Sequence, residues 1–168
     1  MQKNTYSRSV KNFRLYSFYN LIPIGIIVLL DEWIKFIALK KLPAEGSLVD
    51  PGLIAFAIHR NSGIAFDVPF KMPIIILTSI VIGFFLLKIA RKNFHRHPNI
   101  AVASLTIVIG ALGNLYDRLI YQFTVDYIIL FGRLAINLSD IVIVSGVVWL
   151  LLASRRNKAH KLVHPNEL

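Results

Sequence analysis

Four long apolar runs limit what this chain of 168 residues can fold into. They cover about residues 21–39, 72–89, 100–119 and 135–153, and each has close to the roughly 20 residues that an α-helix needs to cross a bilayer. In lipid, a segment must satisfy its own backbone hydrogen bonds, which favours helices. The sequence therefore predicts an all-α polytopic membrane protein, in which residues 1–168 form one domain with four transmembrane helices.

Composition narrows the possible functions. Hydrophobic residues make up 55% of the chain and charged residues 17%. Soluble domains average about 45–50% apolar and about 25% charged residues. It has no cysteine, which excludes disulfides, thiolate metal sites and a cysteine nucleophile. The net charge of +10 comes from short basic blocks between the apolar runs, without the aromatic and basic pattern of a nucleic-acid site. We therefore expect the lipid bilayer as a partner and no nucleic acid.

The basic residues also predict an orientation. Four spans place both termini and the 88–99 loop on one side, where each of these three segments carries four Lys or Arg, while the opposite side carries six. The positive-inside rule then puts both termini in the cytoplasm. Eight of the nine Asp and Glu fall in the outer connectors or at the outer ends of spans. Polar chemistry is therefore predicted at the outer membrane face.

The segment between the first two apolar runs, about residues 40–70, is broken by several Gly and Pro residues. Within it, LIAFAIHR at 53–60 predicts a strand, and NSGIAF at 61–66 predicts a turn that leads into a second strand. The segment is too polar and too broken to span a bilayer. We expect a small β-element that lies on the outer membrane face.

A dense polar cluster lies between Gly110 and Asp140, where the third apolar run ends and the fourth begins. Ionisable residues flanked by membrane-grade apolar sequence are costly, so such a cluster is a functional-site hypothesis by default. Its members are Asn114, Asp117, Arg118, Asp126, Arg133, Asn137 and Asp140.

Two aspartates of this cluster suggest a catalytic pair. Asp126 lies in the connector at 121–134, and Asp140 lies about one turn into the fourth run without a basic residue on its local helix face. If the connector folds back, the two carboxyls can meet at the outer mouth of the bundle. Close carboxylates in a low-dielectric site share a proton, which supplies a base to activate water and an acid for the leaving nitrogen. The alternative is two separately capped aspartates, one of them capping the fourth helix.

The first run carries an ionic pair of its own. Asp31 and Lys35 are four residues apart, so they share a helix face and can pair within the membrane. The pair can lock the helix structurally, border a substrate pocket, or do both.

On the third run, Asn114, Asp117 and Arg118 share one helix face. Gly110 and Gly113 just before them permit close approach of another helix. Asp117 and Arg118 can have a structural role, with Arg118 holding carboxylates or carbonyls of the outer loops. Asn114 is deeper, where it can order a pocket or a substrate backbone.

Other chemistries have weaker support. Of the five His residues, only His59 is predicted on the polar face, which leaves an intramembrane serine without a base. The sequence has no G-x-S-x-G, no zinc motif and no Gly-rich phosphate loop. A small ion or lipid transporter that uses Asp31, Lys35 and Asp140 as a relay is a rival, but it predicts carboxylates spread through the membrane thickness. A non-enzymatic scaffold is another rival, and it would tolerate loss of both Asp126 and Asp140.

Together, five short motifs resemble the bacterial lipoprotein signal peptidase (signal peptidase II) family. They occur in family order and cover nearly the whole chain. They are D-E-W-I-K at 31–35, N-S-G-I-A-F at 61–66, G-A-L-G-N-L-Y-D-R at 110–118, V-D-Y at 125–127 and N-L-S-D at 137–140.

The resemblance implies a membrane aspartyl endopeptidase with Asp126 and Asp140 as its catalytic pair, without metal or cofactor. It implies four transmembrane helices, an extracytoplasmic β-cradle and a short connector helix over the site, in the bacterial cytoplasmic (inner) membrane. The substrate would be a prolipoprotein with a diacylglyceryl cysteine, cut just before that cysteine, and we expect a monomer. The matching substrate-binding or structural positions are Asp31, Lys35, Asn61, Gly63, Asn114, Asp117, Arg118 and Asn137.

Three departures from the family pattern stand near these motifs. Glu32 replaces the usual Gln and adds a charge, and Gln122 replaces a Gly before the V-D-Y motif. Ser139 replaces an Ala, and we expect its hydroxyl to hydrogen-bond Asp140. We also expect Asn61, Asn114 and Asn137 to bind the substrate backbone, and the assignment of acid and base within the pair stays open.

Overall fold

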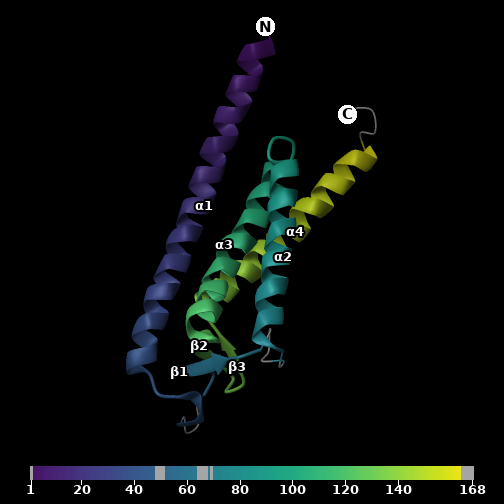
Figure 1. The fold of residues 1–168 in the computed structure, drawn as a ribbon. Coiled ribbons are helices and arrows are strands. Elements are labelled where there is room, and N and C mark those ends of the chain that lie inside the picture. Colours follow the sequence, from purple (N-terminus) through teal and green to yellow (C-terminus); the bar gives the residue numbers. More distant parts are fainter. Residues whose placement is uncertain (1, 48–51, 64–67, 69, 164–168) are drawn as a thin grey trace.

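Four helices and a small sheet at one end make up the computed structural model (Figure 1). It describes residues 2–47, 52–63, 68 and 70–163, with side chains described from residue 16 to 157 apart from residue 17 and those gaps. The elements in order are α1 (Gln2–Lys41), a short 3-10 turn η1 (Glu45–Ser47), β1 (Ile54–Asn61), α2 (Met72–Asn93), α3 (Pro98–Tyr121), β2 (Thr124–Leu130), β3 (Leu134–Ile136) and α4 (Leu138–Val163).

Three of the predicted spans are confirmed as helices long and apolar enough to cross a membrane. Within the described residues they are 72–93, 98–121 and 138–157, with mean hydropathies of 2.4, 1.6 and 1.7. The fourth helix begins at Leu138, a few residues later than the apolar run suggested. The first predicted span lies within α1, whose apolar part contains Asp31, Glu32 and Lys35. A crossing by α1 stays a prediction.

Helix α3 is the centre of the bundle, because α1, α2 and α4 all pack against it. Its predicted close contacts at small residues are confirmed. A Cβ at Gly110 would lie 2.9 Å from Ile143 Cγ1 of α4, and a Cβ at Gly113 would lie 2.6 Å from Ser139 Oγ. The absence of side chains at these glycines therefore lets α3 and α4 approach closely.

The sheet is assembled from two distant parts of the chain. Strand β1 pairs antiparallel with β2, and β2 pairs antiparallel with β3. The predicted strand at 53–60 is confirmed, but its partner comes from the connector at 121–134 and not from the segment after Asn61. Of that segment, 64–67 and 69 lie outside the described residues, and 68, 70 and 71 are not in a strand.

The connector between α3 and α4 contains no helix, so a short connector helix over the site stays a prediction for the other outer segment, of which 48–51, 64–67 and 69 lie outside the described residues. Gln122 has a φ of 64° at the end of α3, in the left-handed region that stops a helix. The following TVDYIIL is rich in β-branched and aromatic residues, which favour a strand. Positive φ values at Phe131 and Gly132 then reverse the chain into β3. The connector is therefore a strand pair.

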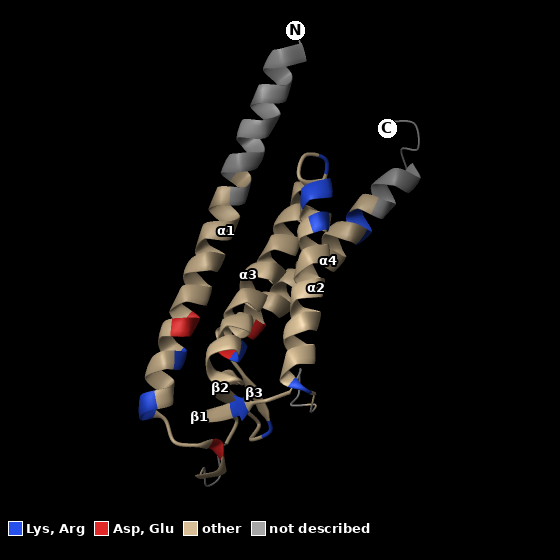
Figure 2. Ribbon diagram, viewed as in Figure 1, with Lys and Arg blue, Asp and Glu red and all other residues tan. Residues whose placement is uncertain are grey.

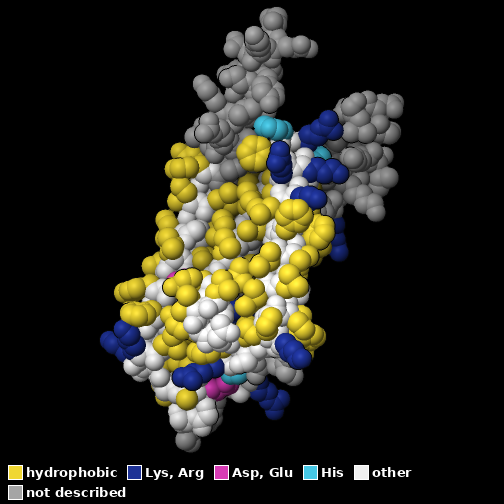
Figure 3. All heavy atoms as spheres, in the orientation of Figure 1, with side chains coloured by type: hydrophobic (Ala, Val, Ile, Leu, Met, Phe, Trp, Pro, Cys, Tyr) yellow, Lys and Arg dark blue, Asp and Glu magenta, His cyan; other side chains and the backbone are white. Residues whose placement is uncertain are grey.

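The surface matches a protein that lies in lipid. Large apolar side chains, Leu77, Ile80, Phe84 and Phe85 among them, are exposed along α2, and Figure 3 shows apolar side chains over the helical body between basic residues at its two ends. An exposed apolar area of this extent is unusual for a soluble monomer. In Figure 2 the described acidic residues all lie in the half of the molecule nearest the sheet.

The close approach at Gly113 predicts a loss of stability on adding one methyl group. We expect Gly113→Ala to lower the free energy of unfolding by about 1–3 kcal/mol, because the new Cβ would overlap Ser139 Oγ. Gly25→Ala on α1 is the matched control, since a Cβ there meets nothing within 4 Å. Thermal unfolding in detergent measures both variants, and equal melting temperatures would contradict the packing described.

The left-handed Gln122 predicts a gain of stability on substitution by glycine. We expect Gln122→Gly to raise the free energy of unfolding by about 0.5–1 kcal/mol, because glycine adopts a φ of 64° without strain. Gln122→Ala is the control that removes the amide but keeps the Cβ. If Gln122→Gly raises the free energy of unfolding no more than Gln122→Ala does, the prediction of backbone strain at Gln122 is contradicted.

Candidate active site

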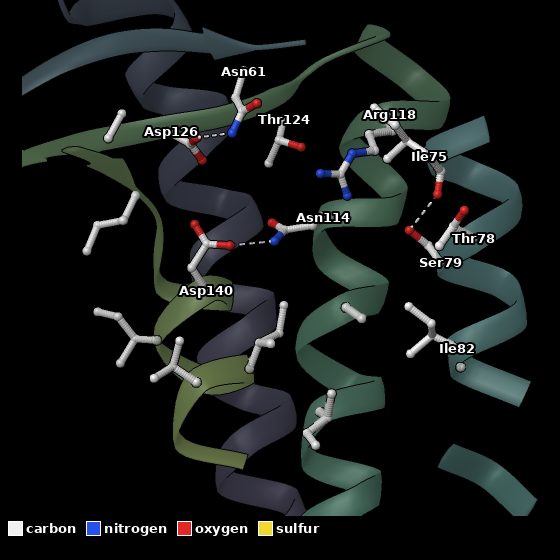
Figure 4. A pocket seen from close by; sticks show the side chains of 18 of the residues that line it. Asn61, Ile75, Thr78, Ser79, Ile82, Asn114, Arg118, Thr124, Asp126 and Asp140 are labelled. Atoms are coloured by element: carbon white, nitrogen blue, oxygen red, sulfur yellow. Dashed lines mark hydrogen bonds between the residues drawn. The ribbon is translucent and has the colours of Figure 1, made fainter. Parts of the chain in front are cut away.

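A cavity of about 990 Å³ opens between α2, α3 and α4, and the sheet closes one of its ends (Figure 4). Its walls are mainly apolar, with Ile74, Ile82, Ile107 and Val144 as examples. Polar groups gather at the end nearest the strands. These are the side chains of Asn61, Asn114, Arg118, Thr124, Asp126 and Asp140.

Asp126 enters this cavity from β2 and is almost completely buried. Asn61 Nδ2 donates to one carboxylate oxygen at 3.1 Å, and Asn137 Nδ2 donates to the other at 2.7 Å. Burial, and after it the negative charge of Asp140, raise the pKa of Asp126 to about 7. The hydrogen bonds from Asn61 and Asn137 and the charge of His59 act in the opposite direction on this pKa. Asp126 therefore titrates near neutral pH.

Asp140 reaches the same cavity from the first turn of α4. Its backbone N–H donates to Asn137 Oδ1 at 2.9 Å, and the Asn137 backbone N–H donates to Asp140 Oδ2 at 3.2 Å. This reciprocal pair is a capping box, which satisfies two backbone donors at the start of a helix. The other oxygen, Oδ1, accepts from Asn114 Nδ2 at 2.7 Å. Asp140 therefore caps α4, as the alternative interpretation of the sequence expected, and it also lines the cavity.

Asn137 connects the two aspartates. Its side-chain amide contacts Asp126, while its backbone N–H contacts Asp140. The same amide donates to Asn114 Oδ1 at 3.1 Å, so both asparagines lie between the carboxylates. The structure therefore brings Asp126 and Asp140 together around one residue, although they come from a strand and a helix. In this structure Asn61, Asn114 and Asn137 hold the aspartates, and a role in binding substrate stays a prediction for them.

A buried ionic cluster lies beside these residues and is centred on Lys35. Its Nζ lies 3.0 Å from Asp31, 3.0 Å from Glu32 and 2.8 Å from Asp117. The predicted pairing of Asp31 with Lys35 is confirmed. Asp117 and Glu32 join them, which the sequence did not predict. Because Asp117 also accepts the Val125 backbone N–H at 3.1 Å, the cluster fixes the strand residue next to Asp126.

Asp31 also holds the start of α4. Its carboxylate accepts the backbone N–H groups of Leu138 and Ser139 at 3.0 and 3.1 Å, which otherwise have no partner at a helix N-terminus. It accepts the Ser139 hydroxyl at 2.6 Å and the Tyr127 hydroxyl at 2.8 Å. The prediction that Ser139 hydrogen-bonds Asp140 is wrong. Adjacent helical residues point about 100° apart, so Ser139 faces α1 while Asp140 faces the cavity.

The remaining predicted residues take different places. Arg118 lines the cavity, and the charges acting on it are those of Asp140, Asp126 and Asp117. Gly63 is buried and donates its backbone N–H to Asn61 Oδ1 at 3.0 Å, which orients the amide that contacts Asp126. Within the described residues, no three His, Cys, Asp or Glu side chains are grouped as a metal site requires.

His59 is the cross-strand partner of Asp126, and no role was predicted for it from the sequence. Its Nδ1 pairs with Glu45 Oε2 on η1, and both side chains are partly exposed. The pairing of β1 with β2 was not foreseen, so nothing in the sequence connected His59 to Asp126. A strand signal in the connector, such as the run TVDYIIL, was the available clue.

Comparison of the sequence with known proteins points to one family. The family model described as signal peptidase (SPase) II matches residues 23–156. A lipoprotein signal peptidase of Sulfurovum sp. (strain NBC37-1) is 30% identical over 144 residues, which cover 83% of this chain and 93% of the relative. A lipoprotein signal peptidase of Clostridium novyi (strain NT) is 33% identical over 141 residues, which cover 79% of this chain and 93% of that relative.

The fold agrees as well. A solved structure described as a bacterial membrane enzyme superposes with a TM-score of 0.69 at 25% identity, and the match covers 83% of this chain and 90% of the other. A second structure of the same description gives a TM-score of 0.63. All five motifs quoted above lie within the residues that the family model matches. The chain therefore belongs to the signal peptidase II family of proteases.

Proposed function

We propose that this chain removes the signal peptide from prolipoproteins that carry a diacylglyceryl cysteine, by cutting just before that cysteine. The names of its relatives support the substrate class. The single observation that carries the chemistry is the placement of Asp126 and Asp140 in one cavity, both bonded to Asn137. The proposed enzyme is an aspartyl endopeptidase.

In the proposed mechanism, the two aspartates hold one proton between them. The ionised carboxylate takes a proton from a water molecule, which attacks the scissile carbonyl carbon. The protonated carboxyl polarises the carbonyl oxygen and then supplies the proton that the leaving amine of the cysteine needs. The raised pKa of Asp126 supports a shared proton at neutral pH. Acid and base are not assigned to individual residues, because a coupled pair titrates as a unit.

The apolar part of the cavity suits the lipid of the substrate. Its walls come from α2, α3 and α4, and large apolar side chains surround the space that leads to the aspartates. Acyl chains in this space would place the glyceryl cysteine next to the polar end. The acyl chains already lie in the hydrocarbon of the bilayer, so an apolar cavity accepts them without the desolvation cost that polar walls would add.

The proposed setting is the bacterial cytoplasmic membrane, with four spans, both termini in the cytoplasm and the cavity's polar end near the outer face. All six acidic residues with described side chains lie in the half of the molecule that contains the sheet, away from the basic loop at 88–99 that the positive-inside rule places in the cytoplasm. The same gathering argues against a transport relay, which needs carboxylates through the thickness of the membrane. We propose that the enzyme acts as a monomer and without metal.

The dyad is tested by removing one carboxyl at a time. We expect Asp126→Asn and Asp140→Asn each to slow cleavage of a lipidated prolipoprotein by at least about a hundredfold, because each removes a proton-transfer group. The measurement is a gel-shift assay with the purified variants. Glu45→Gln is the matched control, since Glu45 lies on η1 and does not line the cavity; it should retain most of the activity. Processing by either asparagine variant at the wild-type rate would refute the dyad.

The raised pKa of Asp126 predicts a pH dependence. The active form keeps one proton on the pair, and this proton is lost as the pH rises through about 7, so the cleavage rate should fall above that pH. The Asn61 hydrogen bond lowers the pKa of Asp126. Asn61→Ala should therefore move this limb of the pH–rate profile to higher pH.

Stability provides an independent readout of the same pKa. The folded carboxyl of Asp126 binds its proton more tightly than the unfolded one, whose pKa is 3.8. Stability should then fall as the pH rises from about 4 to about 7. Asp126→Asn should reduce this pH dependence in thermal unfolding. A cleavage rate of the wild-type enzyme that keeps rising above pH 8 would contradict loss of the shared proton near pH 7.

A further inference from the structure

Two buried polar atoms at the cavity's polar end have no hydrogen-bond partner. They are the Thr124 hydroxyl oxygen and Arg118 Nε. Buried polar atoms in folded proteins are nearly always paired, because an unpaired one keeps the full cost of its lost hydration. Among the described side chains, only one further buried atom is unpaired, Asp117 Oδ1, and Asp117 does not line the cavity. The cavity thus contains two polar groups for which the fold provides no partner.

Thr124 is placed to face the reacting groups. It lies two residues before Asp126 in β2, so both side chains project from the same face of the strand. Its cross-strand partner is Asn61, which contacts Asp126. Thr124 is only 2% exposed, so protein atoms cover its hydroxyl and keep it out of solvent. Figure 4 shows Thr124 between Asp126 and Arg118, with its hydroxyl oxygen turned toward the side of the guanidinium.

The chemistry of the two groups defines the ligand. Arg Nε is only a donor, and a threonine hydroxyl donates or accepts. Two unpartnered donors at one end of a cavity suit an acceptor oxygen. The neighbouring Asn61 and Asn114 side chains each use one N–H donor to hold Asp126 or Asp140, whereas Thr124 Oγ and Arg118 Nε have no partner at all. An ionised carboxylate only accepts, and the one proton that the pair shares is assigned above to the scissile carbonyl, so a second carbonyl oxygen needs other donors.

We propose that Thr124 is a substrate-binding residue, whose hydroxyl acts with Arg118 Nε to bind a carbonyl oxygen of the substrate next to the scissile bond. This inference rests on the proposed function and deepens it. Two carbonyls of a lipidated prolipoprotein have the required chemistry. One belongs to the peptide backbone beside the cut, and the other is an ester carbonyl of the diacylglyceryl group.

The test replaces the hydroxyl without changing the shape of the side chain. Thr124→Val should lower kcat/KM for a lipidated prolipoprotein about three- to tenfold, the loss expected for one neutral hydrogen bond. The melting temperature of the ligand-free protein should be unchanged or higher, because an unpaired buried hydroxyl is removed. Thr124→Ser is the matched control, since it keeps the hydroxyl, and it should retain most of the wild-type kcat/KM.

A second substrate identifies the carbonyl. In a dialkylglyceryl substrate, ether links replace the esters while the peptide stays the same. If the penalty of Thr124→Val disappears with the ether substrate, the ligand is the ester carbonyl. If the penalty is equal for both substrates, the ligand is the peptide carbonyl. Both results support an acceptor-oxygen site at Thr124.

Three results would overturn the inference. They are a wild-type kcat/KM for Thr124→Val with both substrates, an equal loss for Thr124→Ser and Thr124→Val, and a lower melting temperature of Thr124→Val. The last result would assign the hydroxyl to the fold, as a partner of Arg118. Failure of the proposed function is recognised separately, because wild type would then not cut the lipidated prolipoprotein or Asp126→Asn would still cut it.

Discussion

The buried ammonium of Lys35 is the interaction on which the rest of the structure depends. It lies within 3.0 Å of Asp31, Glu32 and Asp117, and its side chain is only 1% exposed. Removing one partner of a buried pair typically costs about 3–5 kcal/mol, because the other charge stays buried without compensation. The cluster connects α1 with α3, and Asp31 and Asp117 extend it to the start of α4 and to β2. The two elements that carry Asp126 and Asp140 are thus held by one group of charges.

This arrangement gives Asp140 and Asn137 more than one contact each. Asp140 caps α4 through one oxygen and accepts from Asn114 through the other. Asn137 begins the helix and also contacts Asp126. A carboxylate fixed by several hydrogen bonds needs little reorganisation when charge develops during a reaction. The cavity's polar end is therefore rigid, while its apolar walls offer a large space.

The sequence predicted the elements better than their pairing. The apolar runs predicted α2, α3 and α4 because helices in lipid leave a simple signal of length and hydropathy. The spacing of Asp31 and Lys35 predicted their ion pair, since contacts four residues apart are set by helix geometry alone. The pairing of β1 with β2 joins residues more than sixty positions apart, and no local pattern specifies such a contact.

For the candidate site, sequence reasoning reached the residue types but not their partners. It named Asp126 and Asp140 as a pair, and the structure places both in one cavity. It assigned Ser139 to Asp140, whereas the direction of the first turn of α4 brings Ser139 to Asp31. Thr124 was not singled out, because a threonine in a β-rich stretch is ordinary until its burial and its unpaired hydroxyl are known.

The central claim is that Asp126 and Asp140 act together on one water molecule. A structure with a peptide analogue that carries a hydroxyl in place of the scissile carbonyl tests it most directly, because that hydroxyl marks the position of the attacking water. The account predicts a hydroxyl oxygen within hydrogen-bond distance of one carboxylate oxygen of each aspartate. A hydroxyl bound by only one aspartate, with the other engaged solely in its present protein contacts, would contradict it.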